Sequence, residues 1–171
     1  LITPRTTVVG AHPANTSYTV ALTRGQTFCV RDTNRTAATT LAGSIVSSNK
    51  PIALTLFSGA LNQSGALSCL MDQITNSSYA GTDFVIRRGE GNNERIYVLS
   101  TQNNTSIDFY GAASSNTVSN WSETKEYVIA DSVTYIKTSK PVYLWHVSGF
   151  GDKMSGAQVP NVYCAGTYST A

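Results

Sequence analysis

Two histidines, His12 and His146, could act as bases near neutral pH, and a histidine oriented by a carboxylate is a common general base in hydrolases. His146 lies in the β-rich run 143–147, at the position that Leu56 takes in a similar upstream run. Because that position is apolar, we predict that His146 packs in a partly buried site and is not catalytic. His12 precedes Pro13 in a predicted turn, where we expect it to be exposed. A buried carboxylate bonded to His146 beside an open cleft would favour a hydrolase instead.

The acidic residues offer few ways to build a catalytic pair. A glycosidase needs two carboxylates that flank one bond. The acids here lie mostly in predicted turns or on polar strand faces, so we predict that they are solvated. The sequence also has no phosphate-binding glycine loop, nucleophile elbow or calcium-binding loop. We therefore predict no catalytic residue, no metal site and no cofactor. The acids considered are Asp72, Asp83, Glu90, Glu94, Asp108, Glu123, Glu126, Asp131 and Asp152.

Three cysteines, Cys29, Cys69 and Cys164, are candidate structural residues. They are too widely spaced for a structural zinc site, which uses paired ligands a few residues apart. One disulfide with one free thiol is one interpretation. The other interpretation is that all three are small buried side chains, because free cysteine is often buried.

Aromatic residues in polar surroundings are the strongest binding signal in the sequence. Trp121, Tyr163, Tyr168 and Tyr79 could stack on a sugar or on a partner chain. The alternative is that they pack against an adjoining repeat of the same protein. Trp145, flanked by strand-forming residues, is predicted to lie in the core.

The composition restricts the partners and the compartment. Hydrophobic residues make up 41% of the chain and charged residues 13%, so Ser, Thr, Asn and Gly must supply most of the polar surface. Such a surface is typical of secreted β-proteins. The net charge is +2 and basic residues are scattered, which excludes a nucleic-acid footprint. No apolar run is long enough to span a membrane, so we expect no membrane insertion of this segment, and any export signal or anchor to lie outside it.

The elements that position these candidate residues are predicted to be short strands. Apolar runs at 18–22, 84–86, 96–99 and 127–129 are rich in β-formers and bounded by turn residues. The stretch 66–79 has no sustained helical period and is predicted to be a long loop. We therefore predict an all-β class built of repeated antiparallel β-sandwich-like units, with a propeller-like or barrel-like arrangement as the alternative.

A sequence duplication supports the repeated units. A Lys-Pro corner followed by a β-rich run and Ser-Gly occurs at Lys50-Pro51 and again at Lys140-Pro141, 90 residues later. We place the two copies at about 5–65 and 79–155, in one all-β region of 1–171.

The two Lys-Pro corners predict where strands begin. Proline fixes φ and pushes the preceding residue towards an extended conformation, so we expect Pro51 and Pro141 each to open a strand at equivalent places. The stems of Lys50 and Lys140 should cover the corners. The copies begin and end raggedly, so we expect the natural polypeptide to continue in both directions.

Four blocks in this order resemble the IgGFc-binding protein N-terminal domain family. They are a Lys-Pro-hydrophobic strand that ends at Ser-Gly (47–59), a cysteine followed by acidic and hydrophobic residues (69–73), a Gly-x-x-Phe-Val strand (81–85) and a strand that leads into Asn-Thr (94–105). The resemblance covers about 43–166. It implies secretion, β-structure and an adhesive or structural role, and it does not imply that this copy binds immunoglobulin.

One departure from the family pattern concerns the cysteines. Family members place a cysteine just after Ser-Gly, whereas this chain has Ala60-Leu61-Asn62 there. The family's local disulfide is therefore absent, and Cys69 is left to pair with Cys29, with Cys164 or with neither. The low cysteine content is similar to that of family members in surface proteins of Bacteroidetes bacteria.

These observations predict an extracellular, cell-surface adhesion or binding module. Its partners would be a host or matrix glycan or protein, or neighbouring repeats of the same protein. A stalk or fibre repeat without its own ligand is the alternative, and a glycan-active hydrolase is the distant one.

Overall fold

The computed structural model describes residues 1–34, 40–63, 66–92, 94–111, 115–150 and 153–163, without the side chains of 60–63, 66, 67 and 115. The chain divides into two compact units, Leu1–Ile52 and Ala53–Ala171. The boundary falls inside the first predicted copy of the duplication.

The first unit has little regular structure. Strand β1 (Ile2–Thr3) pairs with β2 (Ile45–Val46), and Val8 forms isolated bridges with His12 and Asp32. His12 stacks on Tyr18 with ring centroids 3.7 Å apart, so the expectation of an exposed His12 is wrong: it is half-buried. The strand predicted at 18–22 is also wrong, since Tyr18 makes one bridge and the following residues make no strand.

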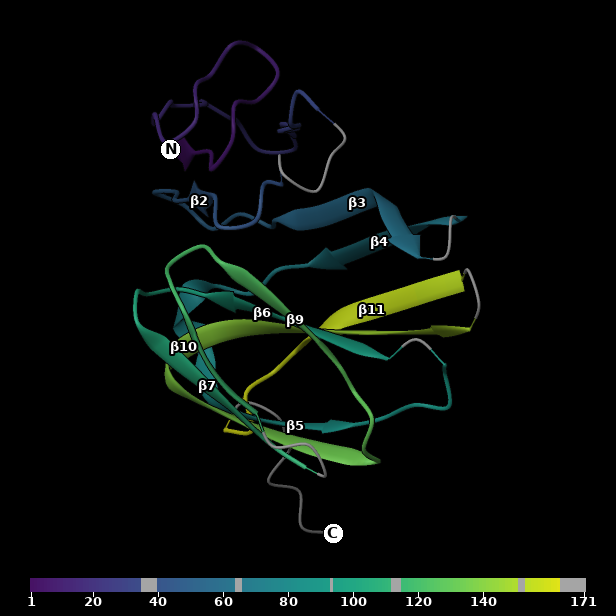
Figure 1. Cartoon of the computed structure of the whole chain (residues 1–171). Helices are drawn as coiled ribbons and strands as arrows, with labels where there is room; N and C mark the ends of the chain where they lie inside the picture. The colour runs from purple at the N-terminus through teal and green to yellow at the C-terminus, as the bar shows by residue number, and fades with distance from the viewer. Residues whose placement is uncertain (35–39, 64–65, 93, 112–114, 151–152, 164–171) are drawn as a thin grey trace, which may run out of the picture. The chain divides into compact units, whose positions relative to one another are not determined.

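The second unit is built around one antiparallel sheet, which confirms the all-β class. Its strands follow the order β8-β7-β10-β6-β9, and β5 and β11 also pair with β10. The sheet curls into a half-barrel, closer to the barrel-like alternative than to stacked sandwiches (Figure 1). Its strands are β5 (Gly81–Arg87), β6 (Arg95–Ser100), β7 (Thr105–Tyr110), β8 (Ser115–Ser119), β9 (Thr124–Val128), β10 (Val133–Phe150) and β11 (Lys153–Val159).

Strand β10 organises this sheet because both of its halves are paired on both sides. The first half lies between β5 and β7, and the second half lies between β6 and β11. Alternate side chains of β10 face the inside of the curl, which is the pattern that a pleated strand imposes. They join a continuous core of Phe84, Ile86, Ile96, Val98, Ile107, Phe109, Ile129, Ile136, Val142 and Leu144.

A hairpin, β3 (Thr55–Gln63) and β4 (Ala66–Gln73), precedes the sheet and is followed by a 3-10 turn, η2 (Ser77–Tyr79). The prediction of a long loop over 66–79 is therefore wrong. The side chains of β4 alternate between two faces, but many of them are polar. Ser68 and Asp72 accept hydrogen bonds from backbone N–H groups of β11, whereas Cys69 is exposed. A polar alternating strand is easily mistaken for a loop.

The two Lys-Pro corners are not equivalent, and this prediction is wrong. Pro141 lies inside β10, beside a register shift between Lys137 and Val142, and its carbonyl accepts a hydrogen bond from Thr101. Pro51 lies in an exposed segment before β3. Among the described strands, β3 pairs with β4 alone. Proline fixes only its own φ, so it cannot choose the strand partners that distinguish the two sites.

The side chains that follow the two corners also differ in burial. Val142 and Leu144 are fully buried, but Ile52 and Leu56 are exposed and Leu54 is half-buried. The lysines differ in the same way. Nζ of Lys140 donates to the carbonyl of Asn103 at 2.6 Å, and Lys50 is exposed.

The cysteines that the structure describes do not fit the buried interpretation. Cys29 and Cys69 are both exposed and both carry free thiols, and Cys164 lies outside the described residues. Within the described ranges, no helix has the length and apolar character needed to cross a lipid bilayer.

Candidate functional site

Three tyrosines come together on the outer face of the curled sheet. Tyr135 of β10 lies opposite Tyr110 of β7 and Val85 of β5, and the rings of Tyr110 and Tyr135 are 5.6 Å apart. Tyr163 is 80% exposed and Tyr110 49%. Val85 and Val133 extend the exposed apolar surface beside them. We call Tyr110, Tyr135, Tyr163, Val85 and Val133 the tyrosine face.

A carboxylate holds the centre of the tyrosine face. The hydroxyl of Tyr135 donates to Asp83, and the hydroxyl of Thr82 donates to the same carboxylate at 2.6 Å. The bonds from Thr82 and Tyr135, with the charge of Lys137, lower the pKa of Asp83 against the effect of burial. In return, the bond to Asp83, aided by burial and the nearby acidic groups, raises the pKa of Tyr135 to about 12.

The chain segment after β11 places Tyr163 beside this centre. The backbone N–H of Val162 donates to the carbonyl of Asp83 at 2.9 Å, and that of Tyr163 donates to the side chain of Asn161 at 2.9 Å. The sequence prediction identified Tyr163 but missed Tyr110, Tyr135 and Asp83. Strand alternation could have indicated their faces, but the pairing of β5, β10 and β7 could not be read from spacing.

Trp121 lies in the turn between β8 and β9 and is 37% exposed. Its backbone N–H donates to the side chain of Asn103 at 3.0 Å, and the N–H of Asn104 donates to Asn120 at 3.2 Å. These bonds join two Asn-rich turns. Tyr79 is 56% exposed at the end of η2, and Tyr168 lies outside the described residues.

A buried carboxylate binds His146, which corrects the prediction of a simple packing histidine. Nε2 of His146 lies 2.6 Å from Oε2 of Glu94, and the side chain of Glu94 is 0% exposed. The hydroxyl of Ser148 donates to Oε1 of the same group. Burial acts to raise the pKa of Glu94, but the bonds from Ser148 and His146, the charge of His146 and the N–H of Gly89 outweigh it and lower the pKa.

The register explains why the sequence prediction missed this pair. Glu94 just precedes β6, which pairs with the second half of β10, so it reaches the inner face beside His146 and Ser148. The comparison of His146 with Leu56 was misleading because β3 and β10 have different neighbours. Glu94 was predicted to be solvated with the other acids, because they lie mostly in predicted turns or on polar strand faces.

His146 also lines an open concavity of about 370 Å³ over β10 and β11. A buried carboxylate bonded to His146 beside an open cleft is the arrangement that favours a hydrolase. It provides a base and the group that orients it. The hydroxyl of Ser148 donates to Glu94 rather than to His146, and none of the described lining residues is acidic. The remaining lining residues are Ser155, Gly156, Ala157, Gln158, Val159 and Pro160.

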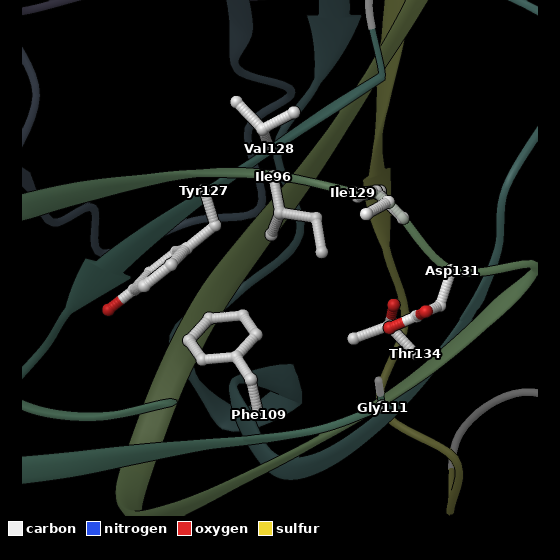
Figure 2. Close-up of a pocket in the computed structure, with 9 residues that line it drawn as sticks. Ile96, Phe109, Gly111, Tyr127, Val128, Ile129, Asp131 and Thr134 are labelled. Carbon is white, nitrogen blue, oxygen red and sulfur yellow. The ribbon is translucent and has the colours of Figure 1, made fainter. Parts of the chain in front are cut away.

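A second cavity lies at the inner face near β9 (Figure 2). Its volume is about 60 Å³, room for roughly two water molecules. Phe109 and Tyr127 form one wall with ring centroids 3.8 Å apart, and Asp131 lies close to Gly111 on the other side. This cavity is too small for an organic ligand. Over the described residues, no group of three or more metal-binding side chains is close enough to hold an ion.

Comparison with known proteins gives one match. The family model described as IgGFc binding protein matches residues 1–166. Neither the curated proteins nor the solved structures contain a significant match. The family is one of binding domains, which agrees with the prediction of a binding module. The chain belongs to the IgGFc-binding protein family.

Proposed function

We propose that this chain is an extracellular, cell-surface adhesion module that binds a partner protein through the tyrosine face. The observation that carries the proposal is the group of three tyrosines around Asp83, with neighbouring valines that are about half exposed. Tyrosine combines a large apolar ring with a hydroxyl and has few rotatable bonds, so it is enriched where proteins bind each other. The uncharged polar composition and the family membership support a secreted setting.

A protein partner fits this surface better than a glycan does. The tyrosine face lies on paired strands, and exposed apolar patches on such faces are typical of protein contacts. Charges of both signs lie opposite each other across β5 and β10, on Asp83 at the centre of the face and on Lys137 beside it. They would fix the orientation of a partner more than they would add affinity.

Binding of the full chain to three immobilised probes tests the proposal. The probes are immunoglobulin G Fc, which the family description names, and collagen and mucin as matrix components. We expect at least one to bind with a dissociation constant of about 1 µM or weaker, as for a small transient interface. Replacing Tyr163 or Tyr110 by Ala should weaken that binding about tenfold or more if these rings are hot spots.

The matched control is Val128→Ala, which removes another exposed side chain from β9 outside the tyrosine face. It should bind as the unmodified chain does. Equal binding by the Tyr163→Ala and Tyr110→Ala variants would refute the tyrosine face as the contact. Absence of binding to all three probes, together with end-to-end association of the chain, would favour a stalk or fibre repeat.

Hydrolysis is a second candidate function, favoured by the contact between Glu94 and His146. Release of p-nitrophenol from p-nitrophenyl acetate tests it. If His146 is a general base on water, the His146→Leu variant should lose the activity and Ser148→Ala should keep it. Activity that His12→Gln removes, or that no variant changes, would eliminate this candidate.

A further inference from the structure

We propose that the concavity beside His146 binds a neutral saccharide, with Nδ1 of His146 accepting a hydrogen bond from a sugar hydroxyl. This site is separate from the tyrosine face and does not depend on the function proposed for that face. The tautomer of His146 and the residues that line the concavity support this assignment.

The contact with Glu94 decides which nitrogen of His146 carries the proton. The carboxylate is fully buried, and its pKa is lowered, so it is ionised and can only accept hydrogen bonds. Nε2 of His146 must therefore be the donor across the 2.6 Å contact. In the neutral imidazole, Nδ1 is then an acceptor, and it has no hydrogen-bond partner in the described part of the chain.

The backbone around Glu94 leaves its carboxylate, which orients His146, little room to move. A Cβ on Gly91 would lie 2.8 Å from Oε1 of Glu94 and 2.5 Å from the carbonyl oxygen of Gly149, and one on Gly89 would lie 2.9 Å from Oε1. The backbone thus closes around the carboxylate, while the His146 side chain remains 22% exposed. A carboxylate that holds an accessible imidazole in one tautomer is a common arrangement in functional sites.

The lining residues indicate the class of ligand. None of the described residues that line the concavity is a lysine, an arginine or an acid, so they offer a charged ligand no counter-ion at neutral pH. The lining includes the hydroxyl-bearing Ser148 and Ser155 and the apolar Ala157, Val159 and Pro160. A saccharide has both hydroxyls and an apolar C–H face. A volume of about 370 Å³ is at the lower end of ligand sites and suits one or two sugar rings.

Nitrogen-15 NMR of the two imidazoles in the full chain tests the proposal directly. The probes are N-acetylglucosamine, galactose, mannose and fucose, added to about 50 mM because small ligands bind open sites at Kd values of about 1 to 10 mM. We expect His146 to be the Nε2–H tautomer and at least one neutral sugar to shift its resonances. Those of His12 should not move, and N-acetylneuraminic acid, which is anionic, should shift neither.

Two variants assign the binding to the concavity. Ala157→Trp fills it from an exposed strand position opposite His146, and should weaken binding at least tenfold. The matched control Val118→Trp adds the same ring to an exposed position of β8 and should bind as the unmodified chain does. The proposal is overturned if no neutral sugar shifts His146, or if Ala157→Trp binds sugar with unchanged affinity.

Discussion

Glu94 and His146 form a hydrogen-bonded pair in which Glu94 is fully buried and His146 reaches solvent. Burying a carboxylate is costly unless hydrogen bonds compensate it. Here Ser148, His146 and the backbone N–H of Gly89 supply those bonds. Removing one partner would leave the charge without compensation, which makes the pair a sensitive site for substitution.

The variant His146→Leu tests whether His146 stabilises the fold through its hydrogen bond to Glu94 or only through packing. Leucine is the residue at the compared position of the first copy, Leu56. We expect the variant to lose about 3 to 5 kcal/mol in the free energy of unfolding, because Glu94 would keep a buried charge without its partner. Urea denaturation measures the loss. The double variant Glu94→Gln/His146→Leu should recover part of it, and a neutral effect of His146→Leu alone would restore the packing interpretation.

The pH dependence of stability gives an independent measure of Glu94. Its pKa is lowered in the folded state from the usual 4.5. Its ionised form therefore stabilises the fold above about pH 4.5, and this contribution is lost as the pH falls through the lowered folded pKa. We expect the stability difference between the unmodified chain and Glu94→Gln to shrink below pH 4.5. Denaturation curves from pH 7 to pH 3 measure it, and a constant difference would contradict the lowered pKa.

At the level of elements, β10 carries core side chains in both of its halves, whereas none of the described side chains of β3 belongs to the core cluster. Leu144 of β10 is 0% exposed, and Leu54, just before β3, is half-buried. The Leu144→Ala variant should lose about 2 to 5 kcal/mol in the free energy of unfolding, and Leu54→Ala clearly less. Chemical denaturation of both variants checks this. Equal losses would mean that the two copies are equivalent in packing after all.

The hairpin protects an edge of the sheet with side chains. The backbone N–H groups of Met154 and Gln158 donate to Ser68 and Asp72 of β4, at 3.2 and 3.1 Å. Unpaired N–H groups on an edge strand otherwise invite pairing with another chain. The side chain of Leu70 covers the backbone between them, close to Gly156.

Removing these acceptors should expose the edge of β11. We expect the Ser68→Ala/Asp72→Ala variant to self-associate, because two N–H groups of β11 would lose their partners. Light scattering after size-exclusion chromatography measures the mass in solution. Cys69→Ser, on the exposed face of the same strand, is the control and should behave as the unmodified chain does. A double variant that associates no more than this control would show that the edge is protected by other means.

At the level of the whole molecule, the two units differ in how many buried hydrophobic residues they contain. The described core cluster lies entirely in Ala53–Ala171, whereas Ile2 and Val8 are the buried hydrophobic residues described in Leu1–Ile52, beside the buried Pro4. We expect a fragment of residues 53–171 to unfold cooperatively, and one of 1–52 to be unfolded, because short chains bury too little apolar surface. Circular dichroism during thermal denaturation tests both fragments. Cooperative unfolding of 1–52 would contradict this assignment of stability.

The sequence by itself determined the all-β class and several strands of the sheet. The predicted runs at 84–86, 96–99 and 127–129 all overlap strands, because β-rich composition and bounding turns act over a few residues. The exposure of Trp121 also followed from its polar neighbours. These properties depend on local chemistry, which is why they could be read without a structure.

The tertiary structure alone decided which residues meet. Glu94 and His146 are 52 positions apart in the chain, and the tyrosine face draws on β5, β7, β10 and the segment after β11. Strand order and register set these contacts, and a shift of one residue would turn each side chain to the opposite face. The Lys-Pro copies show the same point, since a shared local motif was placed among different strand partners. Pairing depends on the competition of all strands for partners, and no local pattern encodes that outcome.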